Sequence, residues 1–234
     1  MTGSESLMSR WCYCVSITMS SFEFNGTDCA MRILLTGFEP FGKYSENSSW
    51  KVAAEIAVNG VPGAVLAVRL LPVSFAGVGV ALRKAVEECC PNVVLMLGQA
   101  AGVDYVKLER IAINMMDAAG ADNDGYTADE EPIYTDGPAA LFTIMDIKGL
   151  RRAVEEQGIA AKVSNSAGLY VCNRLYYEAL RLCNEKPGMK ALFVHLPFYE
   201  GQPSATAGQP TMLLGDMVKA VRIIIGSIMQ EIKK

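Results

Sequence analysis

A cysteine and the chain's only histidine are the residues whose chemistry stands out. Cys172 lies in the stretch SNSAGLYVCNRLYYEAL, where a polar turn gives way to an apolar pattern of helical spacing. His195 closes the apolar run ALFVH. A thiol can attack an amide carbonyl, and an imidazole can take the thiol proton and return it to the leaving amine. The pair therefore suggests nucleophilic hydrolysis of an amide, provided that the fold brings the two side chains together.

The position of Cys172 supports this chemistry without proving it. An N-cap at Ser164, Asn165 or Ser166 would place Cys172 in the first turn of a helix. Free N–H groups and the helix dipole at such a position lower a thiol pKa and can stabilise an oxyanion. Two simpler alternatives stay open. In the first alternative, Cys172 is only a small core residue. In the second, His195 has no catalytic role and its ring is held by a backbone partner.

Glu109 is the third candidate. It lies in LERIAINMM, which the pattern predicts to be extended. An unpaired carboxylate is unfavourable to bury. Glu109 must therefore emerge at a strand end, pair with a cation such as Arg110, or orient the imidazole of His195.

The elements that would position these residues alternate between strand and helix. Short apolar runs that end at Gly or Pro predict strands over 32–38, 63–73, 92–98 and 190–198. Apolar residues at helical spacing predict helices over 49–60, 74–90, 145–158, 169–183 and 210–234. A polar, Gly- and Asp-rich segment over 117–140 predicts a long loop or hairpin arm. Such an order predicts an α/β fold with an open, mostly parallel sheet covered by helices on both faces.

Ligands bind beyond the carboxyl ends of the strands in sheets of this kind. The turn GFEPFG follows the first predicted strand and GQAAG follows the third, and His195 lies at the end of the last. We therefore expect these segments to meet at one edge. Phe38 and Phe41, three residues apart, read either as walls of a flat apolar pocket or as ordinary core residues.

Composition narrows the class of protein. The net charge is −4, with no run of Lys or Arg, which argues against a nucleic-acid surface. Seven cysteines with one histidine fit neither a disulfide scaffold nor a zinc site, so we expect no metal and a reducing, cytoplasmic compartment. The longest apolar stretches, residues 61–82 and 212–229, contain charged residues and so do not read as membrane spans.

Residues 1–30 differ from the rest of the chain. They lack the pattern of a signal peptide and any regular period. We expect a disordered extension there and a single catalytic domain over 31–234.

Together these segments resemble the pyroglutamyl peptidase I family, also called pyrrolidone-carboxylate peptidases. The matching segments occur in order from residue 31 and are LLTGFEPFG, NSSW, LLPVSF, LGQAAG, LERIAIN, SNSAGLYVCN and FVHLPF. The resemblance implies a three-layer α/β/α sandwich and a cytosolic cysteine exopeptidase that removes an N-terminal pyroglutamyl residue from peptides. It also implies a homotetramer without metal or organic cofactor.

The family's site residues can be carried over position by position. The resemblance implies Cys172 as nucleophile, His195 as general base and acid, and Glu109 as the group that orients the imidazole. The residues implied to bind the pyroglutamyl ring are Phe38, Phe41, Asn47, Gln99, Tyr170 and Val171.

One departure from the family leaves alternatives open. The family has an Arg after the segment RIAIN, where this chain has Ala119 and Gly120. A cation near the active site is therefore expected to be missing. The alternatives are a catalytically impaired relative that binds pyroglutamyl peptides, and a hydrolase of another small lactam or amide.

Overall fold

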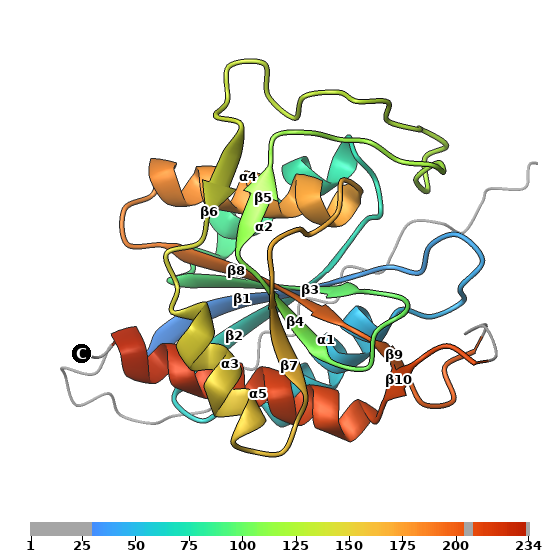
Figure 1. Cartoon of the computed structure of the whole chain (residues 1–234). Coiled ribbons are helices and arrows are strands. Elements are labelled where there is room, and N and C mark those ends of the chain that lie inside the picture. Colours follow the sequence, from blue (N-terminus) through green and yellow to red (C-terminus); the bar gives the residue numbers. More distant parts are fainter. Residues whose placement is uncertain (1–29, 204–207, 233–234) are drawn as a thin grey trace, which may run out of the picture.

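Six strands form one mixed sheet at the centre of the computed structural model, which describes residues 30–203 and 208–232 (Figure 1). The strands, in spatial order, are β2 (Ala64–Leu71), β1 (Met31–Phe38), β3 (Val93–Gln99), β8 (Lys190–Leu196), β4 (Val106–Glu109) and β7 (Ala161–Ser164). All neighbouring pairs are parallel except β4 and β8, which are antiparallel. The predicted α/β class with an open, mostly parallel sheet is confirmed.

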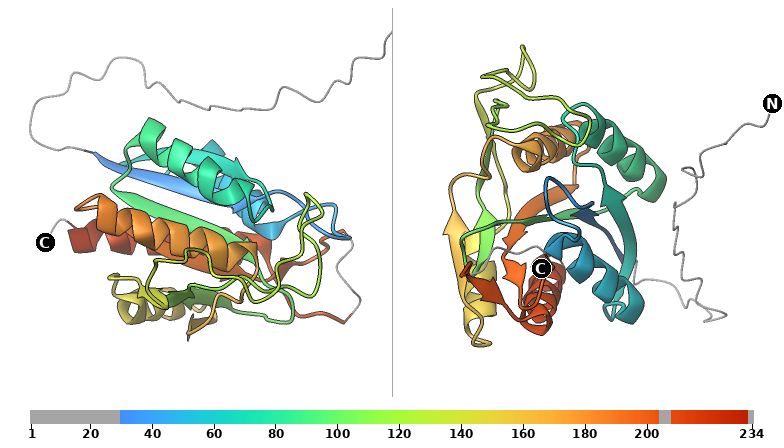
Figure 2. Two further views of the ribbon diagram at one scale, coloured as in Figure 1. Left: turned by 90° about the horizontal axis from the view of Figure 1, so that it is seen from above. Right: turned by 90° about the vertical axis from the view of Figure 1, so that its right-hand side faces the viewer.

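Helices cover both faces of this sheet (Figure 2). One face carries α1 (Ser48–Asn59), α3 (Ile147–Glu155) and α5 (Leu214–Ile232), and the other carries α2 (Gly77–Cys89) and α4 (Val171–Glu185). Successive side chains of a strand point to opposite faces. Ile33 and Leu35 of β1 accordingly pack in the first layer, and Leu34 packs in the second. Burial on both sides explains why the central strands read as continuous apolar runs.

The predicted extended run over 108–116 is interrupted. β4 ends at Glu109, and after Arg110 the chain enters β5 (Ile111–Ile113), which pairs with β6 (Ala140–Phe142) away from the main sheet. The break places Glu109 at a strand end. Two further short strands, β9 (Phe198–Tyr199) and β10 (Thr211–Met212), pair with each other near the carboxyl edge.

The predicted long loop is present between β5 and β6, closed by an isolated bridge between Met116 and Glu131. A buried ion cluster ties it to the helices beneath. The carboxylate of Glu178 in α4 pairs with Arg83 Nε at 2.5 Å and Arg174 Nη1 at 2.7 Å. It also accepts a hydrogen bond from the loop residue Tyr134 at 2.5 Å.

None of the helices within the described ranges has the length and apolar character needed to cross a membrane. The predicted disordered extension falls almost entirely outside the described residues.

Candidate active site

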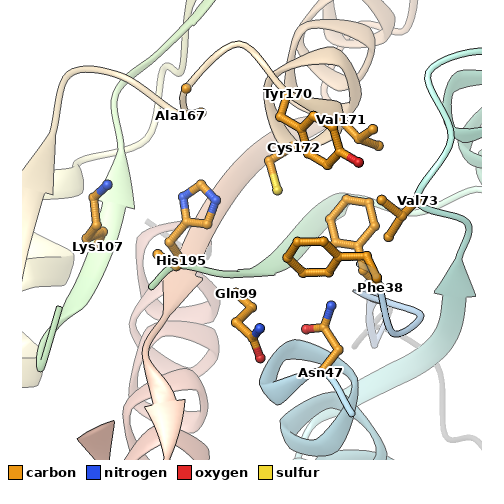
Figure 3. Close-up of a pocket in the computed structure, with 13 residues that line it drawn as sticks. Phe38, Asn47, Val73, Gln99, Lys107, Ala167, Tyr170, Val171, Cys172 and His195 are labelled. Carbon is orange, nitrogen blue, oxygen red and sulfur yellow. The ribbon is translucent and has the colours of Figure 1, made fainter. Parts of the chain in front are cut away.

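A cavity of about 260 Å³ opens at the carboxyl edge of the sheet, between β1, β3, β8 and the beginning of α4 (Figure 3). Its lining residues are Phe38, Phe41, Asn47, Val73, Gln99, Ala100, Lys107, Ala167, Gly168, Tyr170, Val171, Cys172 and His195. All of the candidate site residues lie here except Glu109, which is fully buried behind His195. The expected meeting of the segments at one edge is confirmed.

Cys172 is the second residue of α4, in its first turn as predicted. The predicted N-cap is wrong, because the cap is Tyr170, whose extended backbone precedes the helix and whose side chain makes no capping bond. The Ser-rich residues form a turn of their own instead. Ser166 N–H donates to Ser164 Oγ at 3.4 Å, and Gly168 N–H donates to Ser166 Oγ at 3.2 Å. The N–H groups of Asn173 and Arg174 donate to the Tyr170 carbonyl, and the backbone N–H of Cys172 acts on its own sulfur at the cavity.

The expected lowering of the thiol pKa is also wrong for the resting protein. Burial raises the pKa of Cys172 to about 12, and the negative charge of Glu109 adds to this rise. The backbone N–H of Cys172 and the ammonium group of Lys107 act in the opposite direction, but less strongly. The resting thiol is therefore protonated, and a thiolate forms only when a base takes the proton.

His195 is the base that faces the Cys172 thiol across the cavity. Its ring and the sulfur of Cys172 line the same cavity and point toward each other in Figure 3. His195 Nδ1 lies 2.8 Å from Glu109 Oε1. With Nδ1–H donated to the carboxylate, the other ring nitrogen is left with a free lone pair. Gly98 lies opposite His195 on β3, where a Cβ atom would come within 3.0 Å of the ring.

The antiparallel pairing of β4 with β8 creates this contact. Lys107 lies directly opposite His195, so Lys107 and Glu109, two residues apart, lie on the same face of the sheet as the imidazole. That face is covered by α4, which carries Cys172. Tyr176 of α4 donates a hydrogen bond to the Glu109 carbonyl at 2.9 Å and fixes the strand end.

Away from Cys172 and His195, the cavity is lined by aromatic and amide side chains. Phe38 ends β1, and Phe41 packs against Tyr170 with the ring centroids 6.3 Å apart. Asn47 caps α1 by accepting a hydrogen bond from Ser49 N–H at 3.0 Å. Its amide nitrogen donates to the Glu39 carbonyl at 3.0 Å, so Asn47 fastens the aromatic turn to α1.

Gln99 also lines this aromatic and amide-lined part of the cavity. Its Oε1 accepts hydrogen bonds from Ser48 N–H at 2.9 Å and from Gln202 Nε2 at 2.7 Å. Its Nε2 is buried and has no hydrogen-bond partner among the residues that the structure describes. Sequence reasoning missed Gln202, because nothing in its irregular local sequence indicates that it reaches Gln99, 103 residues away.

Lys107 was missed as well, although the sequence raised the question of an active-site cation. Ala119 and Gly120 are exposed and do not line the cavity. Lys107 does line it, and its Nζ lies 3.6 Å from Glu109 Oε1. Lys107 therefore supplies a cation at the cavity, although the Arg that the family resemblance implies is absent from positions 119 and 120.

A mostly parallel α/β sheet with a cysteine, a histidine and a small apolar pocket at its carboxyl edge is an arrangement suited to hydrolysis of a small ligand's amide bond. Comparison with known proteins narrows this class. The model of the family described as pyroglutamyl peptidase matches residues 31–231, and the chain belongs to that family.

Curated relatives and solved structures agree. The chain is 42% identical over 197 residues to a pyrrolidone-carboxylate peptidase of Thermococcus onnurineus, covering 83% of this chain and 97% of that protein. It is 38% identical over 193 residues to one from Clavibacter michiganensis, covering 82% and 90%. The crystal structure of pyrrolidone carboxyl peptidase from Fervidobacterium islandicum matches with a TM-score of 0.82 at 35% identity, covering 86% and 99%.

Proposed function

We propose that this protein is a cysteine exopeptidase that hydrolyses the amide bond after an N-terminal pyroglutamyl residue. The observation that carries the proposal is the shared cavity of Cys172 and His195, with the imidazole hydrogen-bonded to Glu109. The names of the relatives support the same substrate.

The pocket fits the pyroglutamyl ring, which is a flat, neutral lactam with one N–H and one C=O. Phe38 and Phe41 supply apolar walls for the ring. The free Nε2 donor of Gln99 is suited to the ring carbonyl. Proline lacks that carbonyl and would leave the buried donor unpaired, so the site should reject an N-terminal prolyl residue.

Acylation begins with proton transfer. His195 takes the proton from Cys172 as the sulfur adds to the scissile carbonyl, and the carbonyl electron pair moves onto oxygen. Backbone N–H groups in the first turn of α4 stabilise that oxyanion. When the intermediate collapses, the C–N bond breaks, the leaving amine receives the proton from His195, and a thioester remains on Cys172.

Deacylation repeats these steps with water. His195 accepts a proton from water as the oxygen adds to the thioester, and the departing sulfur regains a proton. Pyroglutamate is released and the thiol is restored. Glu109 holds the imidazole in its working tautomer and stabilises the cation formed at each step.

The test is hydrolysis of a neutral pyroglutamyl aminomethylcoumarin amide by the wild type, Cys172→Ala and His195→Ala. We expect turnover by the wild type, and losses of about 10⁵-fold or more in the variants with melting temperatures unchanged within a few degrees. A prolyl amide is the specificity control. A folded wild-type protein that binds pyroglutamyl peptides without cleaving them would show the impaired relative instead.

A further inference from the structure

The cavity has two unlike halves on either side of Cys172 and His195. One half holds the neutral aromatic and amide groups around Phe38 and Gln99. The other half, across His195 in Figure 3, holds Lys107 and Ala167. Among the described residues that line the cavity, Lys107 is the only lysine or arginine.

This lysine is well placed to meet a ligand. Its side chain is 23% exposed and lines the cavity. Its only carboxylate neighbour within ion-pair distance in the described part of the chain is Glu109, at 3.6 Å. The Oε1 atom of Glu109 that faces Lys107 is already hydrogen-bonded to His195 at 2.8 Å. The ammonium group therefore retains donor capacity for a second anion.

We infer that Lys107 selects leaving residues that carry a carboxylate close to the scissile bond. This inference rests on the proposed function. With the pyroglutamyl ring between the aromatic walls, the leaving amine must face His195, which protonates it. The residue beyond the scissile bond then continues toward Lys107. Consecutive Cα atoms are only about 3.8 Å apart, so a carboxylate on that residue stays inside the cavity that Lys107 lines.

Two kinds of carboxylate satisfy this chemistry. One is the free C-terminal carboxylate of a pyroglutamyl dipeptide, and the other is the acidic side chain of Asp or Glu in a longer peptide. Both would gain Coulomb attraction in a cavity that excludes much of the water. Because the charge is present before and during the reaction, the gain belongs mainly in KM rather than in kcat.

The experiment compares matched substrates that differ in this charge. The first pair is pyroglutamyl-alanine and pyroglutamyl-alanine amide, and the second is pyroglutamyl-glutamate amide and pyroglutamyl-glutamine amide. We expect the wild type to favour the charged member of at least one pair. Lys107→Met should lower that preference, measured as the ratio of kcat/KM values, by about 3- to 10-fold. Lys107→Arg should retain it, and added salt should weaken it in the wild type but not in Lys107→Met.

Lys162 supplies the matched control. It lies beside Lys107 in the register of β4 and β7, but it is exposed, packs over the ring of Tyr105 at 4.0 Å, and does not line the cavity. Lys162→Met makes the same change in charge and should leave both ratios unaltered.

Each other outcome has a distinct meaning. Equal losses for charged and neutral substrates in Lys107→Met, with a shifted pH profile, would show that Lys107 acts only through Glu109 and would overturn the inference. Ratios that are the same in wild type and Lys107→Met would also overturn it. Failure of the wild type to hydrolyse even the neutral amides would instead refute the proposed function.

Discussion

Glu178 and Glu109 are both completely buried, and their surroundings differ. Glu178, under the long loop, is held by two arginines and a tyrosine hydroxyl. Glu109, at the carboxyl edge of the sheet, has His195 at 2.8 Å and Lys107 at 3.6 Å, and its second oxygen has no hydrogen-bond partner among the described residues. Each oxygen of Glu178 is paired with an arginine, whereas only one oxygen of Glu109 has a charged or hydrogen-bonding partner among the described residues.

The difference shows what each region does. A buried charge with complete partners fastens elements together, here α2, α4 and the loop. Buried polar atoms without partners are rare, and they concentrate where a ligand or a reaction supplies the missing partner. Glu109 Oε2 and Gln99 Nε2 are both of this kind: Gln99 lines the cavity, and Glu109 is buried behind His195.

The largest effect is expected from removing the charge at the incompletely satisfied site. Glu109→Gln keeps the shape but no longer fixes the tautomer or stabilises the imidazolium, so kcat/KM should fall by about 10³-fold or more. The free energy of unfolding should change by less than about 1.5 kcal/mol, because a neutral amide is easier to bury. Steady-state kinetics and urea unfolding of the same samples measure both. An active but strongly destabilised variant would reverse the roles assigned to the two glutamates.

The opposite pattern is expected at Glu178. Glu178→Ala leaves two arginines beside an empty buried site, so the free energy of unfolding should fall by about 3–5 kcal/mol. Glu185, a more exposed partner of Arg83, is the matched control, and Glu185→Gln should cost less than about 1 kcal/mol. Urea unfolding checks both values. A stability loss at Glu178 no larger than at Glu185 would contradict a fastening role.

A smaller effect is expected at Gln202, which orients the unsatisfied amide of Gln99. Gln202→Ala frees that amide to turn, so KM for a pyroglutamyl amide should rise by about 5- to 10-fold while kcat changes less. Direct removal of the donor in Gln99→Ala should raise KM more. If Gln202→Ala lowers kcat alone, Gln202 does not act by positioning the ring-binding amide.

The last effect extends the comparison to the thiols at the two ends of α4. Burial raises the pKa of Cys183 to about 12. A raised pKa favours the folded state below the unfolded pKa, and this contribution is lost as the pH rises toward the folded pKa. Between about pH 9 and 11, wild-type stability should therefore fall more steeply than that of Cys183→Ala, by about 2 kcal/mol. Urea midpoints at the two pH values measure the difference, and parallel slopes would show that the folded thiol titrates normally.

Much of the fold follows from local sequence. The apolar runs and helical spacing give the alternation of strands and helices, because both patterns depend on residues a few positions apart. The same local reasoning places Cys172 in the first turn of its helix and His195 in the last strand of the main sheet. It misplaces the N-cap, because three polar residues before α4 all suit a cap and only the backbone around Tyr170 decides.

By itself, the sequence determined the class of sheet and the reactive residue types. The tertiary structure alone decided that β4 runs antiparallel to β8, which sets Glu109 against His195 across 86 residues of chain. It also decided that the Cys172 thiol is protonated at rest, and that Gln202 and Lys107 reach the site. The physical reason is that burial, charge proximity and hydrogen-bond completeness depend on partners distant in sequence, which no local pattern specifies.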